Sequence, residues 1–426
     1  MKPKPENEAS ITAKKNRSKR IFISTGEVSG DLQGSLLIEA LNRQFLAPGK
    51  DLEVKDLESK DLESKDLESK DLEIFALGGD RMAAAGATIW ANTTAIGSVG
   101  ILESLPYILP TLKLQAKIYQ YLQQNTPDLV ILIDYVGPNL RLGNYIRRHF
   151  PQVPIVYYIA PQEWVWSFNH KNTSEIVSIC DRLIAIFPEE ARYYQAKGAH
   201  VTWVGHPLID QIQGAANREQ ARAALGINSS QPVIALLPAS RRQEIKYLLP
   251  VMLAGARAIQ EHLPNVQFVI PVSNQIYRQD IEKAIALFKL PAKILTGENN
   301  HLGIAAADLA ITKSGTVNLE IALLNVPQVV IYRLNPISAW ILAKLLKFSI
   351  PFMSPVNLVL MKSIVPELLQ DQVTPANIVR ESLPLLQNTP KRQQILQDYQ
   401  TMRQALGEIG ACDRAAQSIL AILAQV

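Results

Sequence analysis

Short apolar runs alternate with longer segments of helical periodicity along most of the chain. The runs are rich in Val, Ile and Leu and apolar at successive positions, which is typical of strands buried on both faces of a parallel sheet. The predicted strands fall into two sets, residues 20–24, 74–77, 129–133, 155–159, 183–187 and 201–204, and residues 233–237, 267–271, 309–312 and 328–332. The helix-length segments between them include residues 30–45, 138–149, 242–262 and 317–325. The pattern predicts an α/β protein with two doubly wound parallel sheets, each covered by helices.

Gly, Pro, Asn and Gln cluster between the two sets of strands, near residues 205–231. A chain of 426 residues is also long for a single domain. We therefore expect a first Rossmann-like domain over residues 20–205 and a second over residues 206–373. Residues 374–426 are expected to form helices that pack across both domains.

The unit Lys-Asp-Leu-Glu recurs between Lys50 and Glu73 with a period of five residues. Such a period advances about 140° per copy on an α-helix, because each residue turns about 100°. The leucines therefore never share one face, and residues 50–73 are predicted to be a solvated insertion that builds no core. A functional tether is the alternative. Residues 1–19 are a predicted disordered tail, basic in charge.

Composition indicates a folded protein, since 47% of the residues are apolar and 19% are charged. The formal net charge of +4 (43 basic minus 39 acidic residues) is far from the basic field of a nucleic-acid-binding protein. The two cysteines, Cys180 and Cys412, are far apart in the sequence, which argues against a disulfide framework or a cysteine zinc site. No run reaches the roughly 18 apolar residues of a membrane span, and we expect no secretory signal. We expect a cytoplasmic protein, soluble or bound to a membrane surface.

Ligands of open α/β sheets bind outside the carboxyl ends of the strands, so the loops there are the first candidates for chemistry. After the first strand comes a glycine-bearing turn at residues 26–31, which would let a substrate approach the backbone closely. It is not a dinucleotide fingerprint, since Glu27 and Asp31 would repel a pyrophosphate. A tight turn into a helix capped by Ser29 or Asp31 is an equally good interpretation.

Asp134 directly follows the apolar strand at residues 129–133. A carboxylate at the mouth of such a strand is a candidate general base with a raised pKa. Capping of the next helix is the alternative, although Gly137 or Asn139 lies nearer to the predicted helix start.

The loop after the fourth strand places Glu163 beside Trp164 and Trp166. Aromatic rings there can stack on a sugar or an acyl chain, and Glu163 is a second acid/base candidate. Packing between the domains is the alternative. His206 ends the first set of strands and could reach a phosphate or a leaving group, although a lone histidine is more often structural.

Two loops of the second half predict anion binding. Ser240 and Arg241 follow a strand and open a helix, where free N–H groups, the positive helix end and a guanidinium converge. Ser314, Gly315 and Thr316 form a second strand-to-helix junction that can hold a phosphate, and Glu320 lies one turn later, where it can accept from ribose hydroxyls. Together they indicate a nucleotide-sugar donor.

Two apolar segments, residues 96–121 and 340–361, carry lysines among aromatic and aliphatic side chains. Core burial explains most apolar helices. The interleaved lysines also suit an interfacial binder of acyl chains.

These motifs together resemble the lipid-A-disaccharide synthase family, inverting glycosyltransferases with the two-Rossmann GT-B fold. The resemblance runs from about Arg20 to the C-terminus. It is carried by residues 25–31, 78–82, 97–103, 133–134, 161–166, 205–207, 237–241, 314–320 and 355–358.

The resemblance implies transfer of 2,3-diacylglucosamine from UDP-2,3-diacylglucosamine to 2,3-diacylglucosamine 1-phosphate through a β(1→6) bond, with release of UDP and no metal or other cofactor. Asp134 matches the family's base and Arg241 its leaving-group stabiliser. The implied UDP contacts are Ser240, Arg241, Asn274, Ser314, Gly315, Thr316 and Glu320. The implied acceptor and lipid contacts are Glu27, Ser29, Asp31, Glu163, Trp164, His206 and Asn357. The family is peripheral on the cytoplasmic face of the inner membrane and tends to dimerise, and no nucleic-acid partner is implied.

The chain departs from the family pattern at Gly137, where a second aspartate is common, and at Ala239, where a glycine is common. Gly137 bears on the acceptor geometry. Another UDP-sugar-dependent GT-B glycolipid synthase and a non-catalytic lipid- or nucleotide-binding homologue are the alternative functions.

Overall fold

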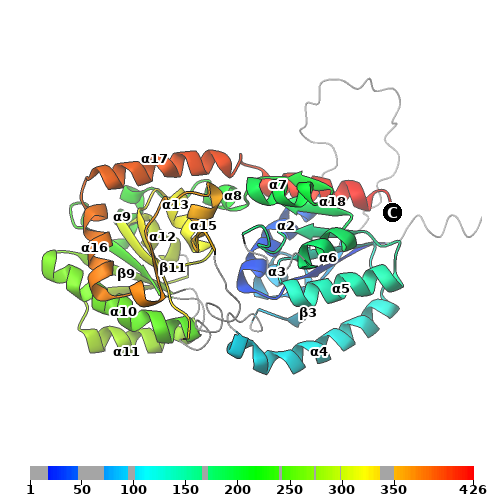
Figure 1. Cartoon of the computed structure of the whole chain (residues 1–426), viewed down its shortest axis with the longest axis horizontal. Helices are drawn as coiled ribbons and strands as arrows, with labels where there is room; N and C mark the ends of the chain where they lie inside the picture. Colours follow the sequence, from blue (N-terminus) through cyan, green and yellow to red (C-terminus); the bar gives the residue numbers. More distant parts are fainter. Residues whose placement is uncertain are drawn as a thin grey trace, which may run out of the picture.

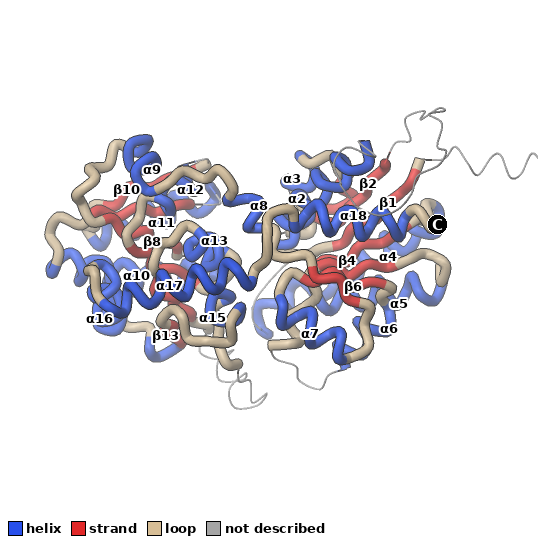
Figure 2. The backbone as a smooth tube through the Cα atoms, turned by 90° about the horizontal axis from the view of Figure 1, so that it is seen from above, coloured by secondary structure: helices blue, strands red, loops and turns tan. Residues whose placement is uncertain are grey.

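The structure, a computed structural model, describes residues 18–46, 72–94, 101–165, 171–238, 242–272, 275–297, 299–335 and 350–426. Two parallel sheets stand side by side, each between layers of helices (Figures 1 and 2). Both predicted doubly wound sheets are therefore confirmed.

The first sheet has seven strands in the order β3-β2-β1-β4-β5-β6-β7. Its strands are β1 (Lys19–Ser24), β2 (Leu72–Gly78), β3 (Thr88–Asn92), β4 (Leu129–Ile133), β5 (Ile155–Tyr158), β6 (Arg182–Ala185) and β7 (Val201–Trp203). Its helices are α2 (Val28–Leu46), α3 (Asp80–Ala84), α4 (Ile101–Gln124), α5 (Val136–His149), α6 (Lys171–Ile179) and α7 (Pro188–Ala196). The order reverses direction between β1 and β4, which is where ligands bind in such sheets.

The second sheet has six strands in the order β10-β9-β8-β11-β12-β13. Its strands are β8 (Val233–Leu237), β9 (Gln267–Val272), β10 (Ala292–Thr296), β11 (Leu309–Lys313), β12 (Gln328–Tyr332) and β13 (Glu367–Leu369). The helices around it are α9 (Arg218–Leu225), α10 (Arg242–His262), α11 (Arg278–Phe288), α12 (Asn299–Ala305), α13 (Val317–Leu323), α15 (Pro355–Val359) and α16 (Pro375–Leu386). Here the order reverses between β8 and β11.

The chain crosses between the two units twice. The first crossing contains α8 (Leu208–Ile212), and the second joins α17 (Pro390–Ala405), which lies on the second unit, to α18 (Ala411–Leu423), which packs against α2 of the first (Figure 1). The crossings are hydrogen-bonded to each other, because the Asp210 carboxylate accepts the backbone N–H groups of Gly410 and Cys412 at 2.6 and 3.1 Å. The last two helices of the chain thus lie on different units.

All ten predicted strands occur in the structure, but β3, β10 and β13 were not predicted. These three are edge strands, and most of their residues are only partly buried. A strand that is not covered on both sides does not need the continuous apolar run that the prediction used. The acidic repeat lies outside the described residues except for its end, since β2 begins at Leu72. There Glu73 pairs with Arg20 at 2.8 Å.

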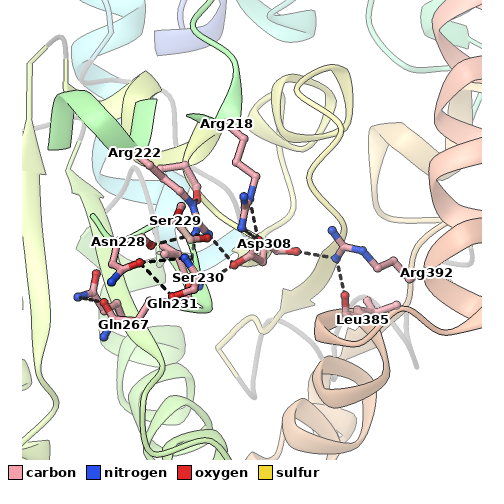
Figure 3. Close-up of polar contacts among 12 residues, drawn as sticks. Arg218, Arg222, Asn228, Ser229, Ser230, Gln231, Gln267, Asp308, Leu385 and Arg392 are labelled. Carbon is pink, nitrogen blue, oxygen red and sulfur yellow. Dashed lines mark hydrogen bonds and ion pairs between the residues drawn. The ribbon is translucent and has the colours of Figure 1, made fainter. Parts of the chain in front are cut away.

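A buried arginine stabilises the second unit (Figure 3). It lies near the amino ends of the strands of the second sheet, opposite the carboxyl ends where ligands of such sheets bind. Arg222 is 2% exposed, and its guanidinium donates to the Asp308 carboxylate at 2.6 Å and to the carbonyl of Ala306 at 2.9 Å. It also donates to the carbonyls of Asn228, Ser229 and Gln231. Burying this charge is tolerated because its hydrogen bonds are made and a carboxylate pairs with it.

Among the helices that the structure describes, none combines the length and the apolar character that crossing a bilayer requires.

Candidate active site

Asp134 lies at the carboxyl end of β4, the central strand of the first sheet. The carboxyl ends of the strands form the ligand-facing edge of each sheet, because ligands of such sheets bind there. β4 pairs with β1 on one side and β5 on the other. Glu27 follows β1 and Glu163 follows β5, and all three residues are half-buried. Burial, and then the charge of Asp134, holds the pKa of the nearby Tyr157 hydroxyl well above its usual range. The structure thus brings three predicted carboxylates to one edge.

The backbone around Asp134 is strained. Asp134 and Tyr135 have φ of 45° and 53°, and Ile159, just after β5, has φ of 58°. A left-handed conformation costs an L-residue roughly 1–2 kcal/mol, and it is an outlier for a β-branched one. The strained segments touch, because the Asp134 N–H donates to the Ile159 carbonyl at 3.0 Å. Such strain is concentrated at functional sites.

The glycine-bearing turn after β1 is shaped by packing. A side-chain carbon at Gly26 would lie 2.2 Å from Cε1 of Tyr135, and one at Gly30 would lie 1.8 Å from Oγ1 of Thr25. Gly26 is therefore needed for the ring of Tyr135, the residue after Asp134, to lie against this turn. The two glycines serve protein contacts at these positions.

Asp31 has a structural role that the sequence did not reveal. It is buried, and its carboxylate accepts the backbone N–H groups of Gly79, Arg81 and Met82 at 2.8, 3.2 and 3.1 Å. These groups lie at the start of α3, so Asp31 caps a helix other than its own. The prediction of Asp31 as an acceptor contact is corrected, because its oxygens are committed to the backbone.

Glu163 and Trp164 lie where the two units meet. Asn172 Nδ2 donates to Glu163 Oε1 at 2.9 Å. The Trp164 ring packs 5.8 Å from the Phe187 ring. It lines a cavity of about 300 Å³ with Glu189, Arg192, Tyr193 and Met361, the last from the second unit. The Trp164 Nε1 donor is buried without a hydrogen-bond partner among the described residues.

Glu190 is a buried carboxylate at the same edge that sequence reasoning missed. It accepts the backbone N–H groups of Ala160, Ile186 and Phe187 at 2.8, 2.9 and 3.2 Å. Burial raises its pKa to about 7, although the three hydrogen bonds act in the opposite direction. Glu190 ties the loops after β5 and β6 together. The only sequence signal was the acidic pair after Pro188.

His206 is buried at the first crossing, with 2% of its surface exposed. Burial lowers its pKa to about 3, so the imidazole is neutral near pH 7. Its Nδ1 accepts the backbone N–H of Leu208 at 3.1 Å, and its ring lies 5.1 Å from that of Phe187. The predicted contact with a phosphate or leaving group stays a prediction, and a neutral ring would serve it as a hydrogen-bond donor and not as a positive charge.

Ser314, Gly315 and Thr316 form the junction between β11 and α13, at the ligand-facing edge of the second sheet. The Ser314 hydroxyl donates to the Met353 carbonyl at 2.7 Å, and the Gly315 N–H donates to Asn318 Oδ1 at 2.8 Å. The junction therefore carries hydrogen-bond donors at the residues where the sequence predicts a phosphate site. A phosphate that uses them must take over from these internal acceptors.

Glu320 is paired with His301, a residue that sequence reasoning missed. Nδ1 of His301 and Oε1 of Glu320 are 2.5 Å apart. This hydrogen bond raises the pKa of His301, against burial and the charge of Arg81, which belongs to α3 of the first unit. Both residues line a cavity of about 260 Å³ together with residues 211–216 of the first crossing. Glu320 thus lines a cavity between the second unit and the first crossing.

Ser240, Arg241 and Asn274 lie outside the described residues. They follow β8 and β9, which neighbour each other, and β8 also pairs with β11. Lys313, at the end of β11, pairs with Glu244 in the first turn of α10 at 3.2 Å. All predicted contacts with UDP therefore follow three adjacent strands of the second sheet.

Asn357 is buried within α15 and is fully hydrogen-bonded. Its Oδ1 accepts from the N–H groups of Ile364 and Val365 at 2.8 and 2.9 Å. Its Nδ2 donates to the Val365 carbonyl at 3.0 Å and to Glu367 Oε1 at 2.8 Å. An amide has two donors and two acceptor positions, so none is left for a ligand. The predicted acceptor contact is corrected to a structural one.

The family model for lipid-A-disaccharide synthetase matches residues 21–422. The chain belongs to the lipid-A-disaccharide synthetase family. The match spans both sheets and the edges described above, so the resemblance noted from the sequence is confirmed.

Curated relatives of this chain carry the name of the same family. The chain is 56% identical to a lipid-A-disaccharide synthase of Gloeothece citriformis over 94% of this chain and 99% of the relative. It is 52% identical to a synthase of the same name from a Synechocystis species, over 94% and 97% of the two chains. The chain is accordingly an enzyme, a glycosyltransferase.

Solved structures with low identity establish the fold of this family member. A complex of MnaA from S. aureus with UDP has a TM-score of 0.64 at 13% identity and covers 96% and 98% of the two chains. MurG of Acinetobacter baumannii has a TM-score of 0.52 at 15% identity and covers 95% and 99%. The predicted GT-B fold is confirmed.

Proposed function

We propose that this chain transfers 2,3-diacylglucosamine from UDP-2,3-diacylglucosamine to 2,3-diacylglucosamine 1-phosphate. The product is lipid A disaccharide 1-phosphate, formed through a β(1→6) bond with inversion, and UDP leaves. One observation carries the proposal within this family. Asp134 is a half-buried carboxylate on strained backbone at the centre of the ligand-facing edge.

In the proposed mechanism Asp134 takes the proton from the acceptor 6-hydroxyl while that oxygen attacks the anomeric carbon. The bond from this carbon to the phosphate oxygen of UDP breaks on the opposite face, and its electron pair leaves with the diphosphate. Inversion follows from this single displacement. A positioned general base contributes typically about 10²–10⁴-fold to the rate.

The departing UDP is assigned to the second unit. Arg241 and Ser240 stabilise the growing negative charge of the diphosphate, together with donors of Ser314, Gly315 and Thr316. Glu320 accepts from the ribose hydroxyls, and Asn274 completes the UDP contacts. The support is topological, since these residues follow the adjacent strands β9, β8 and β11.

The acceptor is assigned to the first unit. Glu27 and Ser29 lie half-buried after β1, beside the turn of Asp134. Trp164 offers a ring for sugar stacking and a buried Nε1 donor without a partner among the described residues, and Glu163 lies beside it. Asp31 and Asn357 are left out of the proposed site for the reasons given above, and His206 is kept in it as a neutral hydrogen-bond donor.

The substrates carry acyl chains, and we place the enzyme at the cytoplasmic surface of the inner membrane through α4. Leu109 and Leu112 on this helix are 69% and 42% exposed, and Lys113 and Lys117 are exposed beside them. Apolar side chains flanked by lysines suit an anionic lipid surface. Flotation with anionic vesicles should recover the protein, and a Leu109→Ser/Leu112→Ser double variant should float less. Equal flotation of both proteins would contradict this placement.

Release of UDP tests the proposed reaction. Purified protein receives UDP-2,3-diacylglucosamine in detergent, with and without 2,3-diacylglucosamine 1-phosphate and with and without EDTA. We expect release that requires the acceptor and survives EDTA. No release with the acceptor present, although the donor is bound, would contradict the proposed acceptor. Preferential use of UDP-glucose or UDP-galactose in competition would indicate a different glycolipid synthase.

A further inference from the structure

Two buried side chains hold the strained turn that carries Asp134. Asn139 has no exposed surface, and its Nδ2 donates to the Asp134 carbonyl at 2.8 Å. The hydroxyl of Tyr157, also fully buried, donates to the same carbonyl at 2.9 Å. The peptide that follows Asp134 is therefore fixed by two donors from two different elements, α5 and β5.

Asn139 also ties this turn to the end of β1. Its Nδ2 lies within hydrogen-bonding distance of the carbonyls of Ile133 and Ser24, at 3.1 and 3.3 Å. Its Oδ1 accepts the Ser24 hydroxyl at 2.7 Å. One amide thus links the carboxyl ends of β1 and β4, the strands that precede Glu27 and Asp134.

The turn needs such support because its conformation is intrinsically unfavourable. Asp134 and Tyr135 are two successive residues with positive φ, and neither is glycine. If the peptide after Asp134 rotated toward an ordinary conformation, its carbonyl would leave both donors. The direction of the Asp134 side chain would change with the backbone, since φ and ψ set where the side chain points.

We propose that Asn139 and Tyr157 are positioning residues for the transfer reaction, which hold the Asp134 carbonyl and thereby aim the Asp134 carboxylate at the acceptor hydroxyl. The inference rests on the proposed function, because it requires Asp134 to be the general base. Both side chains are fully buried, so neither is expected to touch the substrate. Their effect on the rate is exerted entirely through Asp134.

The geometry gives a sharp expectation for kinetics. Misplacement of a reacting group by about 1 Å can cost on the order of 10²-fold in rate. Binding of the UDP-sugar, in contrast, is assigned to the other unit and does not depend on this turn. Loss of the two hydrogen bonds to the Asp134 carbonyl should therefore lower kcat and leave KM for the UDP-sugar nearly unchanged.

Tyr157→Phe is the most informative variant, because it removes one hydroxyl and keeps the ring. We expect kcat to fall about 10-fold, and about 100-fold in Asn139→Ala, with the donor KM within about threefold of wild type. Tyr158→Phe is the matched control. Tyr158 is the next residue of β5 and equally buried, but it packs in the cluster on the other face of the sheet. Its kcat should stay within about twofold of wild type, because Tyr158→Phe leaves both hydrogen bonds to the Asp134 carbonyl in place.

A double variant separates positioning from a general packing defect. In an Asp134→Asn background, Tyr157→Phe should have no further effect on the residual rate, because no base remains to be aimed. An additional 10-fold loss in that background would overturn the inference. So would wild-type kcat in Tyr157→Phe, or a raised donor KM with unchanged kcat.

The failures of the two proposals are distinguishable. If Asp134→Asn abolishes transfer while Tyr157→Phe keeps full kcat, the positioning role is wrong and the proposed base stands. If wild-type protein transfers no diacylglucosamine, the proposed function itself fails. If Asn139→Ala does not fold, as shown by its melting curve, Tyr157→Phe and the double variant decide the question.

Discussion

Replacing His206 by asparagine should reduce the loss of unfolding free energy that occurs as the pH falls below neutrality. The imidazole is buried at the first crossing of the chain, and burial lowers its pKa from 6.5 to about 3. The unfolded chain therefore takes up a proton near pH 6.5, whereas the folded protein does not. This contribution to stability is fully present above pH 6.5 and is lost as the pH falls toward 3.

The magnitude follows from the pKa difference. Each pH unit below 6.5 costs about 1.36 kcal/mol, so wild-type protein should lose about 2 kcal/mol between pH 7 and pH 5 from this residue alone. Asparagine keeps an acceptor for the Leu208 N–H, which His206 Nδ1 accepts at 3.1 Å, and it has no proton to gain. The variant is expected to be less stable than wild type at pH 8, because it loses the packing of the ring on Phe187.

Urea denaturation at pH 5, 6, 7 and 8 measures the difference. The gap in unfolding free energy between wild type and His206→Asn should shrink by about 2 kcal/mol from pH 7 to pH 5. The matched control is His262→Gln, which removes an exposed imidazole from the last turn of α10. A gap that is constant with pH would contradict this prediction, because it would mean that the buried ring is already protonated or that water reaches it.

Three further predictions concern residues that the structure explains. In urea denaturation, Arg222→Met should lower the unfolding free energy by about 3–5 kcal/mol, because it leaves the Asp308 carboxylate and the buried carbonyls without the guanidinium. Arg218→Ala removes an exposed arginine from the same carboxylate and should cost less than about 1 kcal/mol. Gly26→Ala should destabilise by about 1–3 kcal/mol through overlap with the Tyr135 ring, and the melting temperature should recover in Gly26→Ala/Tyr135→Ala; no recovery would contradict the clash. Because the pKa of Glu190 rises from 4.5 to about 7, wild type should lose up to about 3 kcal/mol as the pH rises between those values, and the same slope in Glu190→Gln would contradict this.

The alternation of apolar runs and helical segments predicted the fold well where strands lie inside a sheet. β4, β8 and β12 have the predicted bounds, because each is buried on both faces and continuous apolar runs mark such strands. The pattern failed at β3, β10 and β13, which are edges with partial exposure. Their residues are constrained by one neighbouring strand and carry no distinct signal.

The candidate site could be predicted only in part. Asp134 could be singled out as a candidate because a carboxylate after an apolar run is chemically conspicuous. The commitments of Asp31 and Asn357 to distant backbone groups were invisible, because nothing local distinguishes a carboxylate or amide used for capping from one that binds a ligand. The role of Asn139 depends on Ser24, which lies 115 residues earlier and reaches it only through the pairing of β1 with β4.

A comparison of Asp134→Asn with wild type is the decisive test of Asp134 as the general base. Affinity for UDP-2,3-diacylglucosamine is measured by calorimetry, and transfer is measured in a single turnover with saturating acceptor at pH 7.5. Affinity for the UDP-sugar should stay within about threefold of wild type, while the transfer rate should fall by about 10²–10⁴-fold, the usual contribution of a general base. Transfer within tenfold of wild type by a fully folded Asp134→Asn protein would contradict the assignment of the base.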